Sequence, residues 1–172
     1  MITCKQITKR FGNVTALAPF DLNLEKGEFV AINGASGSGK TTLLLTLGGM
    51  LRPTAGAIHY KDSDLYGRSS AELAEYRAQE VGFVFQMFHL VPYLAVEENV
   101  KLALPNGSDS VRALELLEEF GLTNRLTHTP GELSAGERQR VALARALAPA
   151  RALALAWVLV PALASTMRVI KT

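Results

Sequence analysis

The sequence predicts an α/β fold in which mostly parallel strands alternate with helices around a phosphate-binding loop. Residues 34–41 read Gly-Ala-Ser-Gly-Ser-Gly-Lys-Thr, which matches the spacing G-x-x-x-x-G-K-T. An apolar run at 29–32 precedes this loop as a buried strand, and an apolar stretch at 42–47 follows it as a helix. A second buried strand is expected at 81–85, where the sequence is Val-Gly-Phe-Val-Phe. Strands that alternate with helices in this way are typical of a parallel α/β core.

The loop predicts the first ligand, a nucleoside triphosphate with Mg²⁺. Its glycines permit a tight turn that brings backbone N–H groups onto phosphate oxygens. Lys40 supplies a positive charge to the β- and γ-phosphates, and the Thr41 hydroxyl can ligate the metal. A flexible Gly/Ser turn is the simpler interpretation, but eight residues in register between a strand and a helix disfavour it. The residues predicted to bind nucleotide here are Gly34, Ala35, Ser36, Gly37, Ser38, Gly39, Lys40, Thr41 and Thr42.

The other elements follow from periodicity and from turn residues. Gly12-Asn13 predicts a turn between two strands, Gly48-Gly49 ends the helix after the loop, and Pro105-Asn106-Gly107 separates two later helices. The expected strands are 2–8, 14–24, 29–32, 56–60 and 81–85, and the expected helices are 42–47, 71–79, 96–104, 110–120 and 136–147.

Composition narrows the class of protein. The 172 residues are the usual length of one domain, and 48% of them are apolar, which is enough for a core. Eighteen basic and sixteen acidic residues leave a charge of +2, so nothing favours nucleic acid as a partner. Cys4 is the single cysteine and the start of the chain lacks an apolar signal segment, so we expect a reducing, cytoplasmic location.

A second motif lies about a hundred residues after the phosphate loop. Residues 133–140 read Leu-Ser-Ala-Gly-Glu-Arg-Gln-Arg. Ser134 is a good helix N-cap, and Glu137 is placed to complete a capping box with it. Taken alone, the motif favours a capped helix start. A helix N-terminus with small residues and exposed N–H groups is also an anion site.

Together the two motifs resemble those of the ATP-binding cassette (ABC) family. Residues 133–140 are similar to its signature, with Ala135 where the family usually has glycine, and residues 141–147 are similar to its signature helix. The resemblance covers roughly residues 1–149. It implies a P-loop NTPase with an N-terminal antiparallel β part. It also implies that residues 1–172 are one nucleotide-binding domain, with a helical subdomain at about 87–140.

The resemblance assigns roles to further residues. Two head-to-tail subunits would bury two ATP molecules, and the signature of one would cap the γ-phosphate held by the other. Gln86, at the end of the second buried strand, would contact Mg²⁺ and the attacking water. The alternative is that Gln86 is an ordinary loop residue. Lys40 would act together with Gln86 in catalysis. Phe11 would stack on adenine, although a core phenylalanine is the alternative. The signature residues expected to contact nucleotide are Ser134, Ala135, Gly136 and Glu137.

The segment 87–94, Met-Phe-His-Leu-Val-Pro-Tyr-Leu, is apolar for a surface loop. It either folds onto the helical subdomain or forms an exposed patch. In the family this region contacts the membrane-spanning permease, which would hold the subunit on the inner face of the cell membrane. Residues 82–100 are most similar to the lipoprotein-release and macrolide-efflux subgroup, so we expect export. A soluble ABC protein of translation or DNA repair is disfavoured, because those usually carry paired cassettes.

The family pattern breaks near residue 150. The family follows its signature helix with an apolar strand, then Asp and Glu, which hold Mg²⁺ and polarise water. Here the strand would be 153–156, Trp157 and Val158 follow it, and no acidic residue occurs after Glu137. The C-terminal part of the fold is therefore expected to be incomplete, and 150–172 is an atypical tail. This leaves an alternative function, a degenerate cassette that binds nucleotide without efficient hydrolysis.

Three interpretations of the tail remain. The first is a membrane segment, because residues 152–167 carry no charge, but this run is shorter than the ~20 residues that a spanning helix needs. A natural non-hydrolysing cassette is the second interpretation. The third, which we favour as a hypothesis, is disrupted coding near residue 150. Such a chain would leave apolar surface uncovered, and we expect poor stability of the isolated protein.

Overall fold

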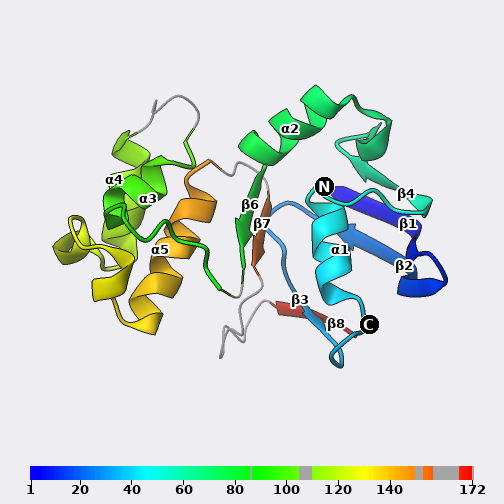
Figure 1. The fold of residues 1–172 in the computed structure, drawn as a ribbon. Helices are drawn as coiled ribbons and strands as arrows, with labels where there is room; N and C mark the ends of the chain where they lie inside the picture. The colour runs from blue at the N-terminus through cyan, green and yellow to red at the C-terminus, as the bar shows by residue number, and fades with distance from the viewer. Residues whose placement is uncertain (86, 105–109, 150–152, 157–166, 172) are drawn as a thin grey trace. The chain divides into compact units, whose positions relative to one another are not determined.

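The computed structural model describes residues 1–85, 87–104, 110–149, 153–156 and 167–171. The chain divides into two compact units (Figure 1). Unit 1 comprises Met1–Ala74 with Leu159–Thr172, and unit 2 comprises Glu75–Val158. The phosphate loop belongs to unit 1 and the residues of the signature to unit 2.

Unit 1 is built on a four-stranded antiparallel sheet of order β2-β1-β4-β5. Its strands are β1 (Ile2–Phe11), β2 (Val14–Leu24), β4 (Ala55–Tyr60) and β5 (Ser63–Asp64). Strands β1 and β2 form the predicted hairpin, with Phe11 opposite Val14 and Gly12 at a φ of 56° in the turn. Apolar side chains of β1, β2 and β4 are buried, among them Ile2, Cys4, Ile7, Leu17, Leu22 and Ile58.

The phosphate loop lies between β3 (Phe29–Asn33) and α1 (Lys40–Leu47), as predicted. Helix α1 buries Leu43, Thr46 and Leu47. Strand β8 (Met167–Lys171) pairs with β3 in parallel, from Phe29 opposite Met167 to Asn33 opposite Lys171. The atypical tail therefore contains a strand that the sequence pattern did not predict.

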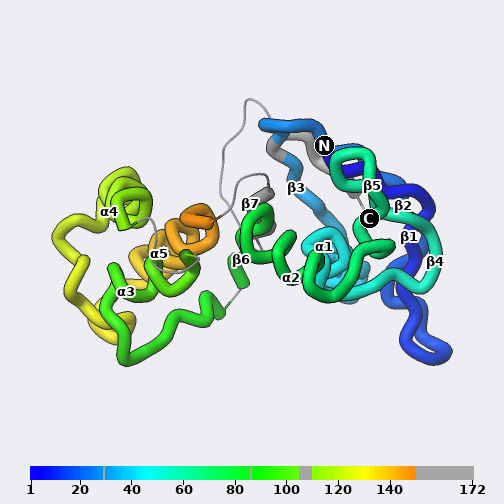
Figure 2. Tube along the Cα trace, turned by 90° about the horizontal axis from the view of Figure 1, so that it is seen from above, coloured from blue at the N-terminus to red at the C-terminus, as the bar shows by residue number. Residues whose placement is uncertain are grey.

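Unit 2 combines a parallel strand pair with a helical cluster (Figures 1 and 2). Strand β6 (Val81–Val84) follows α2 (Ser70–Gln79) and pairs with β7 (Leu153–Ala156), which confirms the strand expected at 153–156. The helices are α3 (Val96–Lys101), α4 (Ser110–Glu119) and α5 (Ala135–Leu147), and α3 is shorter than predicted. Short 3₁₀ turns lie at η1 (Leu65–Gly67), η3 (Thr123–Arg125) and η4 (Pro130–Glu132).

The core of unit 2 lies among α3, α4 and α5. Amphipathic spacing on α4 and α5 directs apolar side chains inward. The buried cluster consists of Val96, Val100, Leu104, Ala113, Leu116, Leu117, Leu122, Leu133, Val141 and Ala144. Within the part of the chain that the structure describes, no helix is long and apolar enough to cross a membrane. Residues 157–166, where most of the uncharged tail falls, lie outside the described residues.

Candidate nucleotide-binding site

The phosphate loop has a backbone that requires glycine. Gly37 and Gly39 have φ values of 83° and 90°, in the left-handed region where side chains are strained. Gly39 is also the N-cap of α1, and a Cβ built on it would lie 2.5 Å from the carbonyl oxygen of Ala16. No side chain fits there, so the loop can form only with glycine at this position.

The ammonium group of Lys40 is bonded to the backbone of this loop. Its Nζ donates hydrogen bonds to the carbonyl oxygens of Gly34 at 2.8 Å and Ala35 at 2.7 Å, and lies 3.4 Å from Ser38 Oγ. The first turn of α1 contains no acidic residue, so the positive potential of the helix N-terminus is not neutralised there. A lysine ammonium and a helix N-terminus at one glycine-rich turn suit the phosphates of a nucleotide.

A divalent cation would find few ligands from the described residues. None of them forms a group of three or more His, Cys, Asp or Glu side chains that could hold a metal. Thr41 is exposed on the first turn of α1, next to Lys40. Its hydroxyl is a hard oxygen donor, which suits Mg²⁺ that keeps phosphate and water as its other ligands.

Phe11 ends β1 with its ring in solvent. The side chain is 52% exposed, and Lys9 Nζ lies 5.0 Å from the ring centroid. The alternative interpretation of Phe11 as a core residue is therefore wrong. An exposed aromatic ring can stack on a base, so its adenine role stays a prediction.

The signature begins α5 as a capped helix. Ser134 is the N-cap, and its Oγ accepts a hydrogen bond from the Glu137 N–H at 3.2 Å. In return, Glu137 Oε2 accepts from the Ser134 N–H at 2.8 Å, which confirms the predicted capping box. Arg125 Nε also donates to Glu137 Oε1 at 2.8 Å. This bond, with those from Ser134, lowers the pKa of Glu137 to about 2.

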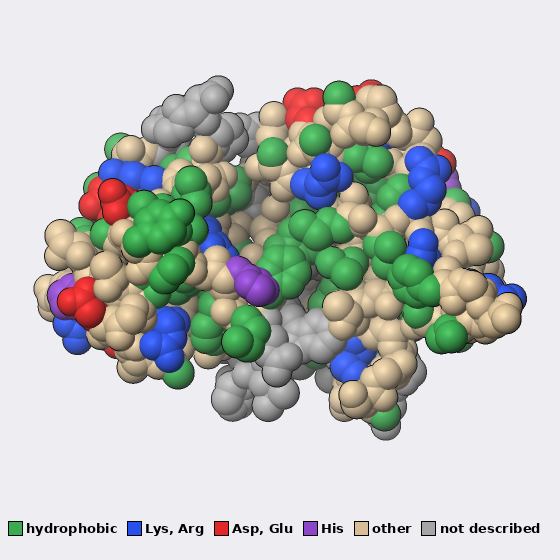
Figure 3. All heavy atoms as spheres, in the orientation of Figure 1, with side chains coloured by type: hydrophobic (Ala, Val, Ile, Leu, Met, Phe, Trp, Pro, Cys, Tyr) green, Lys and Arg blue, Asp and Glu red, His purple; other side chains and the backbone are tan. Residues whose placement is uncertain are grey.

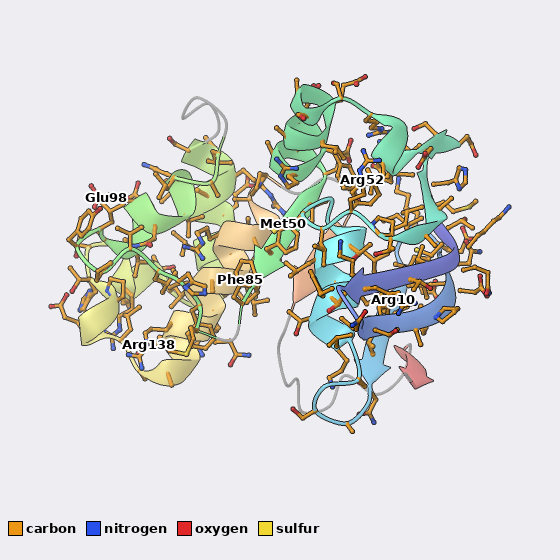
Figure 4. The ribbon with its side chains drawn as sticks, turned by 45° about the vertical axis from the view of Figure 1, so that its right-hand side comes forward. Arg10, Met50, Arg52, Phe85, Glu98 and Arg138 are labelled. Atoms are coloured by element: carbon orange, nitrogen blue, oxygen red, sulfur yellow. The ribbon has the colours of Figure 1, made fainter. Side chains whose placement is uncertain are left out.

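The surface of this turn is open. Ser134, Ala135 and Gly136 are exposed, so the methyl group of Ala135 meets solvent and needs no space inside the protein. Arg138, labelled in Figure 4, lies on the first turns of α5 and donates to the carbonyl oxygens of Leu133 and Pro130. Hydrogen bonds from Arg125 and Arg138 thus support the turn.

The apolar segment 87–94 divides into packed and exposed side chains. Leu90 packs against the helical core, and Phe88 packs against the cluster of Val84, Ala142 and Ala146. Met87 and Tyr93 are 78% and 80% exposed. Figure 3 shows hydrophobic side chains lying among charged ones on the surface that faces the viewer in the orientation of Figure 1. Part of the segment therefore folds onto the helical core, as the first interpretation expects. Met87 and Tyr93 are exposed, and their contact with a permease stays a prediction.

Sequence reasoning missed the two polar residues that hold this segment. Asn99 is fully buried and bonds the backbone of Val91 through both its amide oxygen, at 2.7 Å, and its amide nitrogen, at 3.1 Å. Arg145 bonds the carbonyl oxygens of Phe88 and His89. A polar residue on the apolar face of a short helix was the available signal for Asn99.

Three predicted positions fall where the structure gives no description. Gln86 lies outside the described residues, as do Trp157 and Val158, which stand where the family has its acidic pair. Their proposed roles and the meaning of the missing pair therefore rest on the sequence.

The fold and the loop define a P-loop nucleotide-binding domain. The ABC transporter family profile matches residues 17–156. The lipoprotein-releasing system ATP-binding protein LolD of Idiomarina loihiensis is 43% identical over 155 residues, which cover 85% of this chain and 68% of LolD. The putative hemin import ATP-binding protein HrtA of Staphylococcus aureus strain N315 is 43% identical over 154 residues, covering 84% of this chain and 69% of HrtA.

The solved structures that this chain resembles are also ABC transporter cassettes. The dimeric structure of MJ0796, a bacterial ABC transporter cassette, has a TM-score of 0.76 and 39% identity, covering 87% of this chain and 70% of that one. A second MJ0796 dimer, in a post-hydrolysis state with ADP and Pi, has a TM-score of 0.76 and 38% identity over the same shares of the two chains. The chain belongs to the ABC transporter family and is an ATP-binding subunit of that kind. The predicted P-loop NTPase fold and the resemblance to the lipoprotein-release type are confirmed.

Proposed function

We propose that this subunit couples MgATP binding and hydrolysis to substrate export by a membrane permease. The observation that carries the proposal is the phosphate loop. Lys40 binds its backbone carbonyls, and only glycine fits at position 39. Backbone N–H groups of residues 34–42 would bind the phosphates, Lys40 would neutralise the β- and γ-phosphates, and Thr41 would ligate Mg²⁺. Gln86 would complete the metal and water contacts, and Phe11 would stack on adenine. We assign the whole chain to one nucleotide-binding domain with a helical subdomain at about 87–140.

A second nucleotide-binding subunit would complete the site. The exposed first turn of α5, with Ser134, Ala135 and Gly136, would face the γ-phosphate held by the partner in a head-to-tail dimer. Glu137 supports the turn, because its carboxylate is already bonded to Arg125 and Ser134. The dimeric MJ0796 cassettes support the pairing of two such subunits.

The permease would hold the subunit at the cytoplasmic face of the membrane. Met87 and Tyr93 offer exposed apolar surface in the segment that the family uses for this contact. LolD is named for lipoprotein release, which supports export, whereas HrtA is named for hemin import. We propose export because residues 82–100 are most similar to the releasing type.

Hydrolysis is the step that most needs a test, because no acidic residue follows Glu137. Phosphoryl transfer depends mainly on positioning and charge, which Lys40, Mg²⁺ and the helix N-termini would supply. We therefore expect Mg²⁺-dependent ATP turnover by the purified chain above that of the Lys40→Ala variant. The measurement is phosphate release at saturating ATP. Turnover equal to that of the variant would limit the chain to nucleotide binding.

A further inference from the structure

The segment that follows β6 contains two consecutive residues in a strained conformation. Phe88 and His89 have φ values of 60° and 48°, in the left-handed region that bulky side chains rarely adopt. Neither is glycine, so each costs free energy that the surroundings must supply. The Phe88 N–H donates to the Phe85 carbonyl at 2.9 Å, and the His89 N–H to the Met87 carbonyl at 2.6 Å.

Arg145 binds two carbonyl groups of this turn. Its Nη1 donates to the His89 carbonyl oxygen at 2.7 Å, and its Nη2 donates to the Phe88 carbonyl oxygen at 2.6 Å. The two nitrogens of one planar guanidinium thus bind two consecutive carbonyls in parallel, whereas a lysine would have to reach both from a single nitrogen. The side chain is half-buried, and burial lowers its pKa.

The rest of the segment is attached independently. Asn99 Nδ2 donates to the carbonyl oxygens of Val91, Leu94 and Ala95 at 3.1, 2.9 and 3.1 Å. This anchor comes from α3 and holds residues 91–95. The anchor from α5 is the contact of Arg145, together with the packing of Phe88 on Ala142 and Ala146.

Gly82 brings α5 directly against β6. A Cβ built on Gly82 would lie 2.0 Å from the carbonyl oxygen of Ala146, the residue after Arg145. The strand that precedes the segment and the helix that carries Arg145 are therefore in backbone contact. The guanidinium spans the short distance from that contact to residues 88–89.

We propose that Arg145 is a positioning residue that fixes the apolar segment 87–94 to α5. Because α5 begins at the signature, about 15 Å along the helix from Arg145, this bond makes the segment with exposed Met87 and Tyr93 follow any movement of the signature turn. The functional consequence of this bond rests on the proposed function, because that function assigns the segment to the permease and the signature turn to the partner's nucleotide. Its geometry stands within unit 2 alone.

Hydrogen exchange of backbone amides tests the proposal on the purified chain. In Arg145→Gln, exchange at residues 88–90 should rise about tenfold or more, because two charge-assisted hydrogen bonds are removed. In Arg145→Lys, which keeps the charge but offers one nitrogen in place of two, the rise should be smaller. Amides of α4 should change less than about twofold in both. The matched control is Arg112→Gln, which removes an arginine of α4 beside Glu115, with its side chain 42% exposed, and should leave residues 88–90 unchanged.

Two results would overturn the proposal: no change at residues 88–90 in Arg145→Gln, or an equal rise throughout residues 75–149, which would reflect a loss of global stability only. MgATP binding by the same variants is measured in parallel and should match the unsubstituted chain. Failure of the unsubstituted chain to bind MgATP would contradict the proposed function without altering the exchange result.

Discussion

Replacing Gly39 with alanine is expected to weaken nucleotide binding and to destabilise unit 1. The new Cβ would lie 2.5 Å from the Ala16 carbonyl oxygen and 3.3 Å from a methyl carbon of Leu17. A carbonyl of β2 cannot rotate away as a side chain can, so the loop and the strand would have to separate. The left-handed φ of 90° adds strain. We expect a loss of about 2 kcal/mol or more in unfolding free energy and at least about tenfold weaker MgATP binding.

Gly37→Ala is the matched control for this experiment. Gly37 has a similar φ of 83°, but no atom lies within 4 Å of the position that an added Cβ would occupy. Its cost should be that of the left-handed backbone alone, about 1 kcal/mol. Chemical denaturation and titration with MgATP measure both variants. Equal losses in the two would mean that the contact with Ala16 does not shape the loop.

Gly82→Ala is expected to have the largest effect on unit 2. The added Cβ would lie 2.0 Å from the carbonyl oxygen and 2.6 Å from the carbonyl carbon of Ala146. Both partners are backbone, so β6 and α5 would have to move apart and lose the packing of Val84 against Ala142 and Ala146. Overpacking with a backbone shift costs typically 1–3 kcal/mol, and we expect a loss of about 3 kcal/mol.

The control for Gly82 is Gly131→Ala in the same unit. Gly131 lies in η4 with no atom within 4 Å of the added Cβ and no left-handed φ. Its unfolding free energy should change by less than about 0.5 kcal/mol. Equilibrium unfolding monitored by circular dichroism compares the two. A Gly82→Ala protein as stable as Gly131→Ala would show that β6 and α5 are not in close contact.

Local signals predicted most of the fold. The apolar run at 29–32 and the spacing of the loop predicted β3 and α1, and the Ser134–Glu137 pair predicted the start of α5 within one residue. Strand β8 was not predicted, because Met167–Lys171 mixes charged and apolar residues and forms a strand only through its parallel pairing with β3. Helix α3 ends at Lys101 rather than at residue 104, since 102–104 continue in turns that a helical period does not distinguish.

The candidate site was predictable where one short motif contains it. The phosphate loop and the signature turn are each continuous in sequence, and the structure gives each the expected local form. Arg145 and Asn99 could not be predicted in their roles, because their partners are backbone carbonyls that only the fold brings to them. The exposure of Phe11 likewise depends on how β1 ends at its hairpin.

Titration of the purified chain with MgATP, compared with its Lys40→Ala variant, tests the central claim most directly. Lys40 Nζ lies on the loop carbonyls of Gly34 and Ala35, so its removal deletes the main positive charge of the proposed phosphate site. Calorimetry should show binding by the unsubstituted chain and at least about tenfold weaker binding by the variant. Equal binding by both, or none by the unsubstituted chain, would contradict the assignment of this loop as the nucleotide site.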